Sequence, residues 1–255
     1  MITVNGNPIH VTMFPDKTSQ VWKLDKELFK AKEFVIEWIF EHEGEIMHLN
    51  QLQMLLFKFS LEKIILKLKY LPYGRQDKKI ANDTTFALHS FASMLNNMYF
   101  NKVIIQDPHS QMALDLIERS EAEYPMQQIE NAMHETECDL VCFPDKGAVI
   151  KYTKVFAKEM IYENIPTIYG EKVRDQATGN ILSYKVIGDC KGNSVLICDD
   201  IADGGMTFKI LAKDLLTAGA RSVNLFVTHG IFSKGIQTLK DSGISRIFTQ
   251  DGEVK

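Results

Sequence analysis

The sequence predicts an α/β protein with two tandem domains, each a mostly parallel sheet flanked by helices. Short apolar runs that suit buried strands alternate with longer segments whose apolar residues recur at helical spacing. This alternation runs through both halves of the 255-residue chain and pauses at Ser120–Pro125. Polar clusters also recur where the apolar runs end, which is typical of the ligand-binding edge of a parallel sheet. We therefore expect domains at residues 1–123 and 124–255.

The strands of the first half are predicted by short apolar runs. The run Phe34–Phe40 is the clearest, because its apolar residues alternate with less apolar ones, as in a half-buried strand. The other expected strands are Met1–Val4, Val11–Phe14, Ile64–Tyr70 and Lys102–Gln106. The expected helices are Leu49–Ser60, Thr84–Asn96 with Asp83 as its N-cap, and a segment after Ser110.

The second half repeats this order. The expected helices are Pro125–Thr136, Ala148–Met160, Phe208–Ala218 and a segment after Gly230. The expected strands are Cys138–Phe143, Pro166–Tyr169, Ile181–Ile187, Ser194–Cys198, Val223–Val227 and Arg246–Phe248. The polar segment Glu171–Asn180 is expected to be a loop.

Composition and charge exclude several classes of protein. The apolar fraction of 45% is that of an ordinary globular protein, and the net charge of −4 gives no general attraction to nucleic acid or anionic membranes. No apolar run approaches the roughly 18 residues of a spanning helix, and the N-terminus lacks the order of a signal peptide. The four cysteines form no CxxC pair and are expected to be buried, reduced thiols. These features predict a cytoplasmic protein without nucleic-acid or membrane partners.

The strongest single signal is the segment Asp199–Thr207, which follows a buried apolar run. Thr207 is placed to cap the next helix, whose N-terminal N–H groups suit a phosphate. The carboxylates of Asp199, Asp200 and Asp203 repel phosphate and suit hydroxyl groups or a divalent cation instead. A phosphate cradle beside acidic hydroxyl-binding residues predicts a site for a sugar phosphate.

A cationic cluster follows the turn Pro72-Tyr73-Gly74. Arg75, Lys78 and Lys79 place three cations in five residues, and a charge run of this kind is usually a solvated loop. It also suits a polyphosphate or nucleotide, with Arg75 bidentate to phosphate and Gln76 available for a base edge. The residues alone leave both interpretations open.

Two further clusters also suit phosphate chemistry. His109 follows Asp107 at one strand end, and Asp145 follows another. A lone histidine is more often structural, but with these carboxylates His109 is a candidate for Mg²⁺ or for a hydrogen bond to phosphate. Lys172 and Arg174 lie in the polar segment expected to be a loop. Such a loop either is ordinary exposed chain or closes over a transferring phosphoryl group.

The motifs together resemble those of one family. Asp199–Thr207 resembles the phosphoribosyl-binding loop of type I phosphoribosyltransferases, and Pro72–Lys79 resembles the nucleotide loop of ribose-phosphate pyrophosphokinases, also called PRPP synthetases. Asp107-Pro108-His109, Pro144–Gly147 and Lys172-Val173-Arg174 are similar to that family's Asp-x-His, Pro-Asp-x-Gly and Lys-x-Arg motifs. The motifs occur in family order over residues 41–233.

The resemblance implies two type I phosphoribosyltransferase-like domains and one reaction. The β,γ-diphosphoryl group of ATP passes to O1 of ribose 5-phosphate, giving PRPP and AMP, with Mg²⁺ as cofactor and a homo-oligomer as the expected assembly. The site residues that it implies are Lys172 and Arg174 for catalysis; Arg75, Gln76, Asp77, His109, Glu43 and Glu45 for ATP; Asp199, Asp200, Asp203, Gly204, Gly205, Met206 and Thr207 for ribose 5-phosphate; and His109 and Asp145 for the metal.

The sequence departs from the family pattern at two places. The family usually has Asp-Thr-(Gly/Ala)-Gly-Thr where this chain has Asp203–Thr207, so one hydroxyl is lost and Met206 replaces a glycine. Glu43-Gly44-Glu45 resembles the Asp-Gly-Glu that a neighbouring subunit offers to adenine, but the usual Phe before it is out of step at Phe40.

Two other functions fit parts of the pattern. A phosphoribosyltransferase that consumes PRPP would share the phosphate loop, but it needs a base-binding hood and has no use for Arg75–Lys79. A catalytically silent regulator of a true synthetase would share the fold. Such proteins usually lose the catalytic cations or the ribose carboxylates, and this chain has both sets. The sequence therefore favours the diphosphokinase.

Overall fold

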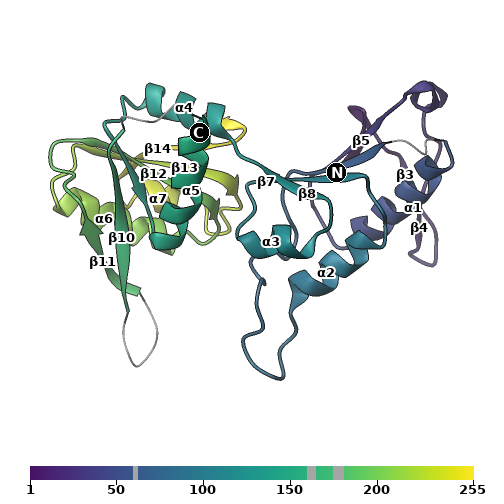
Figure 1. The fold of residues 1–255 in the computed structure, drawn as a ribbon. Helices are drawn as coiled ribbons and strands as arrows, with labels where there is room; N and C mark the ends of the chain where they lie inside the picture. Colours follow the sequence, from purple (N-terminus) through teal and green to yellow (C-terminus); the bar gives the residue numbers. More distant parts are fainter. Residues whose placement is uncertain (60–62, 160–164, 175–180) are drawn as a thin grey trace. The chain divides into compact units, whose positions relative to one another are not determined.

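The computed structural model describes the whole chain except residues 60–62, 160–164 and 175–180, together with the side chains of 157–159, 172–174 and 181–183. The chain divides into two units, Met1–Glu123 and Tyr124–Lys255 (Figure 1). Each unit has a mixed sheet whose central strands are parallel. The predicted α/β class with mostly parallel sheets is confirmed.

Unit 1 is built on a six-stranded sheet in the order β2-β1-β5-β6-β7-β8. These strands are β1 (Ile2–Val4), β2 (Asn7–Pro8), β5 (Phe34–Trp38), β6 (Ile64–Leu68), β7 (Lys102–Gln106) and β8 (Ser120–Glu123). The helices are η1 (Lys26–Lys30), α1 (Glu45–Phe57), α2 (Ala87–Asn96) and α3 (Gln111–Leu116), and β3 (Val11–Met13) pairs with β4 (Ser19–Val21) in a separate hairpin. Strands β5 to β8 run parallel, and β1 and β2 extend the sheet antiparallel.

The core of unit 1 follows the alternation that the sequence predicts. Phe34, Ile36 and Trp38 of β5 are fully buried, while the residues between them are only half-buried. β6 repeats this pattern, and the buried leucines of α1 and α2 belong to the same apolar cluster. The period of two therefore selects the sheet face that packs on the helices.

Two helix starts in unit 1 differ from the prediction. α1 begins at Glu45, not at Leu49, and α2 begins at Ala87 with Phe86 at the N-cap position. Asp83 therefore does not cap α2. A local turn comes before the helix instead, in which the Thr84 N–H donates to the Ala81 carbonyl and the Thr84 hydroxyl also bonds Ala81.

Unit 2 has a seven-stranded sheet in the order β11-β10-β9-β12-β13-β14-β15. These strands are β9 (Leu140–Phe143), β10 (Thr167–Arg174), β11 (Ile181–Ile187), β12 (Ser194–Ala202), β13 (Ser222–Gly230), β14 (Ile244–Thr249) and β15 (Gly252–Glu253). The helices are α4 (Met126–Glu135), α5 (Lys146–Glu159), α6 (Met206–Thr217) and α7 (Gln237–Lys240). β11 and β15 are the antiparallel edges of this sheet, and β10 and β11 form a long hairpin (Figure 1).

Helices cover both faces of the unit 2 sheet. Val195 and Ile197 of β12 belong to an apolar cluster with α6 and α7, whereas Leu196 and Cys198 belong to a second cluster with α4 and α5. Adjacent residues of β12 thus face opposite helix layers, as expected for a strand buried on both sides. None of the helices in the described parts of the chain is long and apolar enough to cross a bilayer.

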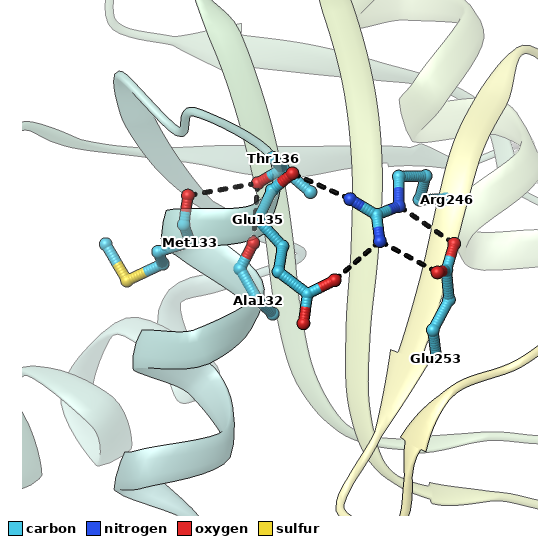
Figure 2. A network of polar contacts seen from close by, with 6 residues as sticks. All are labelled: Ala132, Met133, Glu135, Thr136, Arg246 and Glu253. Carbon is cyan, nitrogen blue, oxygen red and sulfur yellow. Dashed lines mark hydrogen bonds and ion pairs between the residues drawn. The ribbon is translucent and has the colours of Figure 1, made fainter.

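An arginine ties the last hairpin of unit 2 to helix α4 (Figure 2). Arg246 donates to both carboxylate oxygens of Glu253, at 2.8 and 2.7 Å, and to the carbonyl and carboxylate of Glu135, each at 2.6 Å. Its guanidinium also lies 4.8 Å from the centre of the Phe248 ring. These hydrogen bonds raise the pKa of Arg246, so it stays charged, and they join segments far apart in sequence.

Candidate active site

The sheet of unit 2 brings three polar clusters to one edge. β10, β9, β12 and β13 are parallel neighbours in that order, so their carboxyl ends point the same way. Asp145 follows β9, Asp199–Thr207 spans the end of β12, and Thr228–Gly230 ends β13. This is the edge at which open α/β sheets bind ligands.

The phosphate loop is the short connection Asp203–Gly205 between β12 and α6. Gly205 is at the N-cap position with φ of 74°, a left-handed conformation that favours glycine. A Cβ atom there would lie 2.7 Å from Leu239 Cδ2, so the close packing of this loop also requires glycine. Gly204 differs, because an added Cβ would meet only Lys234 Cγ, at 3.8 Å.

The start of helix α6 corrects one prediction. Thr207 does not cap the helix, since α6 begins at Met206 and Thr207 lies within its first turn. Gly205 makes the turn without any side-chain cap bond, so the first N–H groups of the helix keep their capacity to bind an anion. The Met206 side chain is 60% exposed at this helix end.

The two carboxylates lie within strand β12, not after it as predicted. Parallel pairing with β13 continues to Ala202 opposite Gly230, and this pairing keeps Asp199 and Asp200 in extended backbone. The N–H of Asp200 donates to Asp199 Oδ1 at 3.0 Å. Burial and the neighbouring carboxylate of Asp200 raise the pKa of Asp199 well above its ordinary value.

Lys151 of α5 is a neighbour that sequence reasoning missed. Its Nζ lies 4.0 Å from Asp200 Oδ2, and the two side chains are only 16% and 7% exposed. The same ammonium counteracts the rise in the pKa of Asp199. The available signal was helical spacing, because Ala148, Tyr152 and Val155 form a buried stripe and Lys151 lies three residues after Ala148.

Asp145 lies at the start of helix α5. Its Oδ1 accepts a hydrogen bond from the Ala148 N–H at 3.1 Å, the pattern of an N-cap carboxylate. The helix begins at Lys146, earlier than the predicted Ala148. The metal or ribose role expected for Asp145 therefore has to coexist with capping.

The structure places Lys172 and Arg174 on a strand, contrary to the expected loop. Both lie in β10, where Lys172 pairs with Tyr184 and Arg174 with Ile181 of the antiparallel partner β11. The hairpin shifts register between Val173 and Arg174. Their side chains, and residues 175–180 of the predicted loop, lie outside the described part of the chain.

Unit 1 brings its own clusters to the carboxyl ends of β6 and β7. The Tyr73 hydroxyl donates to Glu43 Oε1 at 2.7 Å, which raises the pKa of Tyr73 to about 12. Glu43 therefore lies beside the turn that leads to Arg75 and Gln76, which are exposed. Both backbone groups of Gln76 are hydrogen-bonded. Its N–H donates to the Tyr73 carbonyl, and its carbonyl accepts from the Leu88 N–H.

Glu45 has a structural environment that its expected contact with ATP does not explain. Its carboxylate is buried and accepts from the Met1 amine at 2.6 Å, the Trp38 indole at 2.9 Å and the Glu41 N–H at 2.8 Å. Burial raises the pKa of Glu45, but these donors outweigh it and hold the pKa below its ordinary value. Glu45 thus joins the start of α1 to β5.

Asp107 and His109 follow β7 in two different environments. Asp107 is 1% exposed, has φ of 42°, and donates its N–H to the Glu123 carbonyl at 2.8 Å. His109 is exposed at the start of the connection to α3. The backbone bend at Asp107 therefore directs the chain so that the histidine reaches the surface of unit 1.

A metal site built from protein side chains alone is not formed by the described residues. Among them, no three His, Cys, Asp or Glu side chains converge on a point that would hold an ion. Mg²⁺ usually takes one or two carboxylates and completes its octahedron with water and substrate phosphates. A half-buried carboxylate such as Asp145 fits that mode of binding better than it fits a closed protein cage.

Comparison with known proteins places this architecture in a class. No family model matches the chain. The fold is similar to the crystal structure of phosphoribosylpyrophosphate synthetase from Mycobacterium smegmatis, with a TM-score of 0.73 and 20% identity, covering 95% of this chain and 79% of that one. The chain is therefore an α/β protein with the phosphoribosyltransferase-like fold of that synthetase.

Curated relatives give the particular family that this chain resembles. The ribose-phosphate pyrophosphokinase of Mycoplasmopsis pulmonis is 26% identical over 245 residues, which is 92% of this chain and 73% of that protein. The enzyme of the same name from Pyrococcus abyssi is 28% identical over 244 residues, which is 92% of this chain and 81% of that protein. Over most of its length, the chain is a relative of the ribose-phosphate pyrophosphokinases.

Proposed function

We propose that the protein is a ribose-phosphate diphosphokinase, which transfers the β,γ-diphosphoryl group of ATP to O1 of ribose 5-phosphate. The observation that carries this proposal is the similarity to curated ribose-phosphate pyrophosphokinases across 92% of the chain. The carboxyl-terminal edge of the unit 2 sheet supports the proposal. There, the adjacent carboxylates of Asp199 and Asp200 are followed a few residues later by the glycines at the start of α6.

Unit 2 is proposed to hold the acceptor substrate. The N–H groups at the start of α6, in the segment Gly204–Thr207, bind the 5-phosphate. Asp199, Asp200 and Asp203 accept hydrogen bonds from the ribose hydroxyls, since ionised carboxylates are acceptors only. Ribose held at both ends leaves O1 in a defined position, and such positioning supplies much of the catalysis in phosphoryl transfer.

Unit 1 is proposed to hold the donor. Arg75 binds triphosphate oxygens in bidentate fashion, and Gln76, Asp77 and Glu43 contact the nucleoside. Glu45, for which the resemblance also implies a contact with ATP, is buried among three donors. His109 would help to hold Mg²⁺ together with the triphosphate, and Asp145 is the second candidate for a contact with the metal or the ribose. Bound Mg²⁺ supplies charge neutralisation of the phosphate oxygens.

Lys172 and Arg174 are the proposed catalytic cations. In the transfer, the O1 hydroxyl of ribose 5-phosphate loses its proton to water and O1 bonds to the β-phosphorus. The bond from that phosphorus to the α,β-bridging oxygen breaks, and AMP leaves. Negative charge builds on the transferring group and on the leaving oxygen. Cations placed near this developing charge stabilise the transition state more than they stabilise the ground state, and they therefore lower the barrier.

We propose a homo-oligomer in the cytoplasm, with ATP and ribose 5-phosphate as small-molecule partners. Light scattering at several protein concentrations tests the assembly, and a monomer at all concentrations would contradict it.

The decisive experiment is incubation of the purified protein with ATP, Mg²⁺ and ribose 5-phosphate. We expect AMP and PRPP to appear in equal amounts, measured by chromatography and ³¹P NMR. Release of pyrophosphate on supplying PRPP with a nucleobase would indicate a phosphoribosyltransferase instead. A protein that yields no AMP, but changes the rate of an added synthetase, would be a silent regulator.

Two variants test the assigned roles. Lys172→Ala should lower kcat by orders of magnitude with little change in ribose 5-phosphate binding, because the cation acts on charge that develops during transfer. Asp200→Asn should weaken the binding of ribose 5-phosphate instead. A near-normal kcat in the first variant, or unchanged kinetics in the second, would remove the residue from its role.

A further inference from the structure

Lys151 is a largely buried cation beside the carboxylates that are proposed to bind ribose, and it has no role in the reaction proposed above. It lies on α5, between the buried residues Ala148 and Tyr152, and its ammonium lies 5.1 Å from the centre of the Tyr152 ring. Its Nζ is 4.0 Å from Asp200 Oδ2, with the two side chains 16% and 7% exposed. Solvent therefore screens this pair far less than it screens a surface ion pair.

Because Lys151 lies on helix α5, the packing of this helix fixes the position of its ammonium relative to the sheet. α5 packs on the same face of β12 as Leu196 and Cys198, and Asp200 continues that face by the period of two. Asp145 caps the start of the helix. The ammonium is thus held by the fold, before any substrate binds.

The carboxylates need such a cation in order to bind a sugar. Asp199 and Asp200 are adjacent, and like charges at this separation resist ionising together. A carboxyl group that keeps its proton loses acceptor capacity toward a ribose hydroxyl. On the neighbouring strands, Asp199 precedes Asp200, and His229 pairs with Ile201 and so lies on the other face of the sheet. On α5, Lys146 pairs with Glu171 at 2.6 Å and Lys154 is exposed. Among the described side chains of α5, the ammonium of Lys151 is the charge beside Asp200.

We propose that Lys151 is a positioning residue for the ribose 5-phosphate site, whose ammonium neutralises and holds the Asp200 carboxylate so that it accepts a ribose hydroxyl. This rests on the proposed function of the site, and it adds a residue outside the sequence motifs. Lys151 acts through Asp200 and is not assigned any contact with the reacting atoms.

The test compares four proteins: wild type, Lys151→Met, Lys151→Arg and the control Lys154→Met, which removes an exposed lysine from the same helix. Isothermal calorimetry gives the dissociation constant for ribose 5-phosphate, and initial rates give kcat and the KM for each substrate. We expect Lys151→Met to raise the ribose 5-phosphate dissociation constant about 10-fold, the size expected for a charge-assisted contact. The KM for ATP should not change, Lys151→Arg should recover most of the affinity, and Lys154→Met should match the wild type.

The pH profile separates positioning from general damage. In Lys151→Met the carboxylate pair keeps a proton to higher pH, so the affinity loss should be largest near pH 6 and should shrink toward pH 8.5. A loss that is equal at all pH values, or equal for both substrates, would overturn the proposal. If Lys151→Met does not fold, Lys151→Gln keeps a polar end group without the charge and carries the same expectations.

A double-mutant cycle provides the sharpest outcome. If Lys151 acts through Asp200, adding Lys151→Met to Asp200→Asn should cost less than twofold in ribose 5-phosphate affinity. Full additivity would refute the proposal. A wild type that binds ribose 5-phosphate but forms no PRPP would refute the proposed function and leave Lys151 testable by calorimetry. If the wild type forms PRPP and Lys151→Met binds ribose 5-phosphate with unchanged affinity, the proposed function stands and the role of Lys151 is refuted. A wild type that does not bind ribose 5-phosphate would refute both the proposed function and the role of Lys151.

Discussion

Two adjacent glycines in the phosphate loop should respond to alanine in opposite directions. Gly205 has φ of 74°, and a Cβ atom there would lie 2.7 Å from Leu239 Cδ2. Gly204 has no such backbone requirement, and the nearest atom to its Cβ position is Lys234 Cγ at 3.8 Å, an ordinary contact. The pair therefore forms a matched experiment within one loop.

The expected magnitudes follow from these geometries. Alanine at position 205 should lower the free energy of unfolding by about 1 to 2 kcal/mol because of its left-handed backbone. The movement of Leu239 that makes room for the new Cβ atom should cost about 1 to 2 kcal/mol more. Gly205→Ala should therefore lower the stability of unit 2 by about 3 kcal/mol. Gly204→Ala should be neutral or should stabilise by up to about 1 kcal/mol, because alanine restricts the unfolded chain.

Hydrogen exchange followed by mass spectrometry reports on unit 2 directly. Peptides from β12 and α6 give the opening free energy of the element that carries the loop. The two tryptophans, Trp22 and Trp38, both belong to unit 1, so their fluorescence in a urea titration serves as an internal control. Equal effects of the two substitutions would refute the assigned backbone requirement at Gly205. A parallel shift of the tryptophan transition would show that the effect is not confined to unit 2.

Three further substitutions test other contacts. Glu45→Gln should destabilise unit 1 more at pH 7 than at pH 3. A carboxylate whose pKa is lowered by folding stabilises the fold above its unfolded pKa of about 4.3, and this contribution is lost as the pH falls. Tryptophan fluorescence in urea at both pH values is the measurement. Arg246→Met should cost about 1 kcal/mol, less in 1 M salt because the partners are partly exposed, as measured by exchange of β14 amides; an effect independent of salt would contradict the ionic account. Lys234→Gln should weaken ribose 5-phosphate binding several-fold, since its chain lies over Gly204 near the proposed phosphate; calorimetry with unphosphorylated ribose, whose binding should not change, is the control.

The strand-end clusters were predictable because they depend on local chain properties. A buried strand needs an uninterrupted apolar run, and the residues that end the run are at the sheet edge by construction. This holds for β7 before Asp107, for β9 before Asp145 and for β12 before Asp203. The predicted boundaries were less accurate where pairing with a neighbour extended a strand. Pairing with β13, for example, extends β12 so that it includes Asp199 and Asp200.

Helix starts were harder to predict, because capping depends on the conformation of single residues. Asp83 and Thr207 have the side chains of N-cap residues, yet α2 begins after Phe86 and α6 after Gly205. The start of α6 is decided at Gly205 by its left-handed backbone and by its close packing against Leu239. Neither of these depends on the side chain of Thr207. A good capping side chain nearby therefore does not fix the boundary.

By itself, the sequence determined the α/β class, the main parallel strands and most of the helices, and the motifs that indicate a sugar phosphate and a nucleotide. These follow from periodicity and from neighbours along the chain. Strands β2, β4, β8 (Ser120–Glu123) and β15 were missed. Only the tertiary structure revealed that Glu45 receives three donors within unit 1, and that Lys151 lies beside Asp200. The physical reason is distance in sequence: Met1 and Glu45, or Lys151 and Asp200, meet because separate strands and helices pack together, and no local pattern encodes which of them will meet.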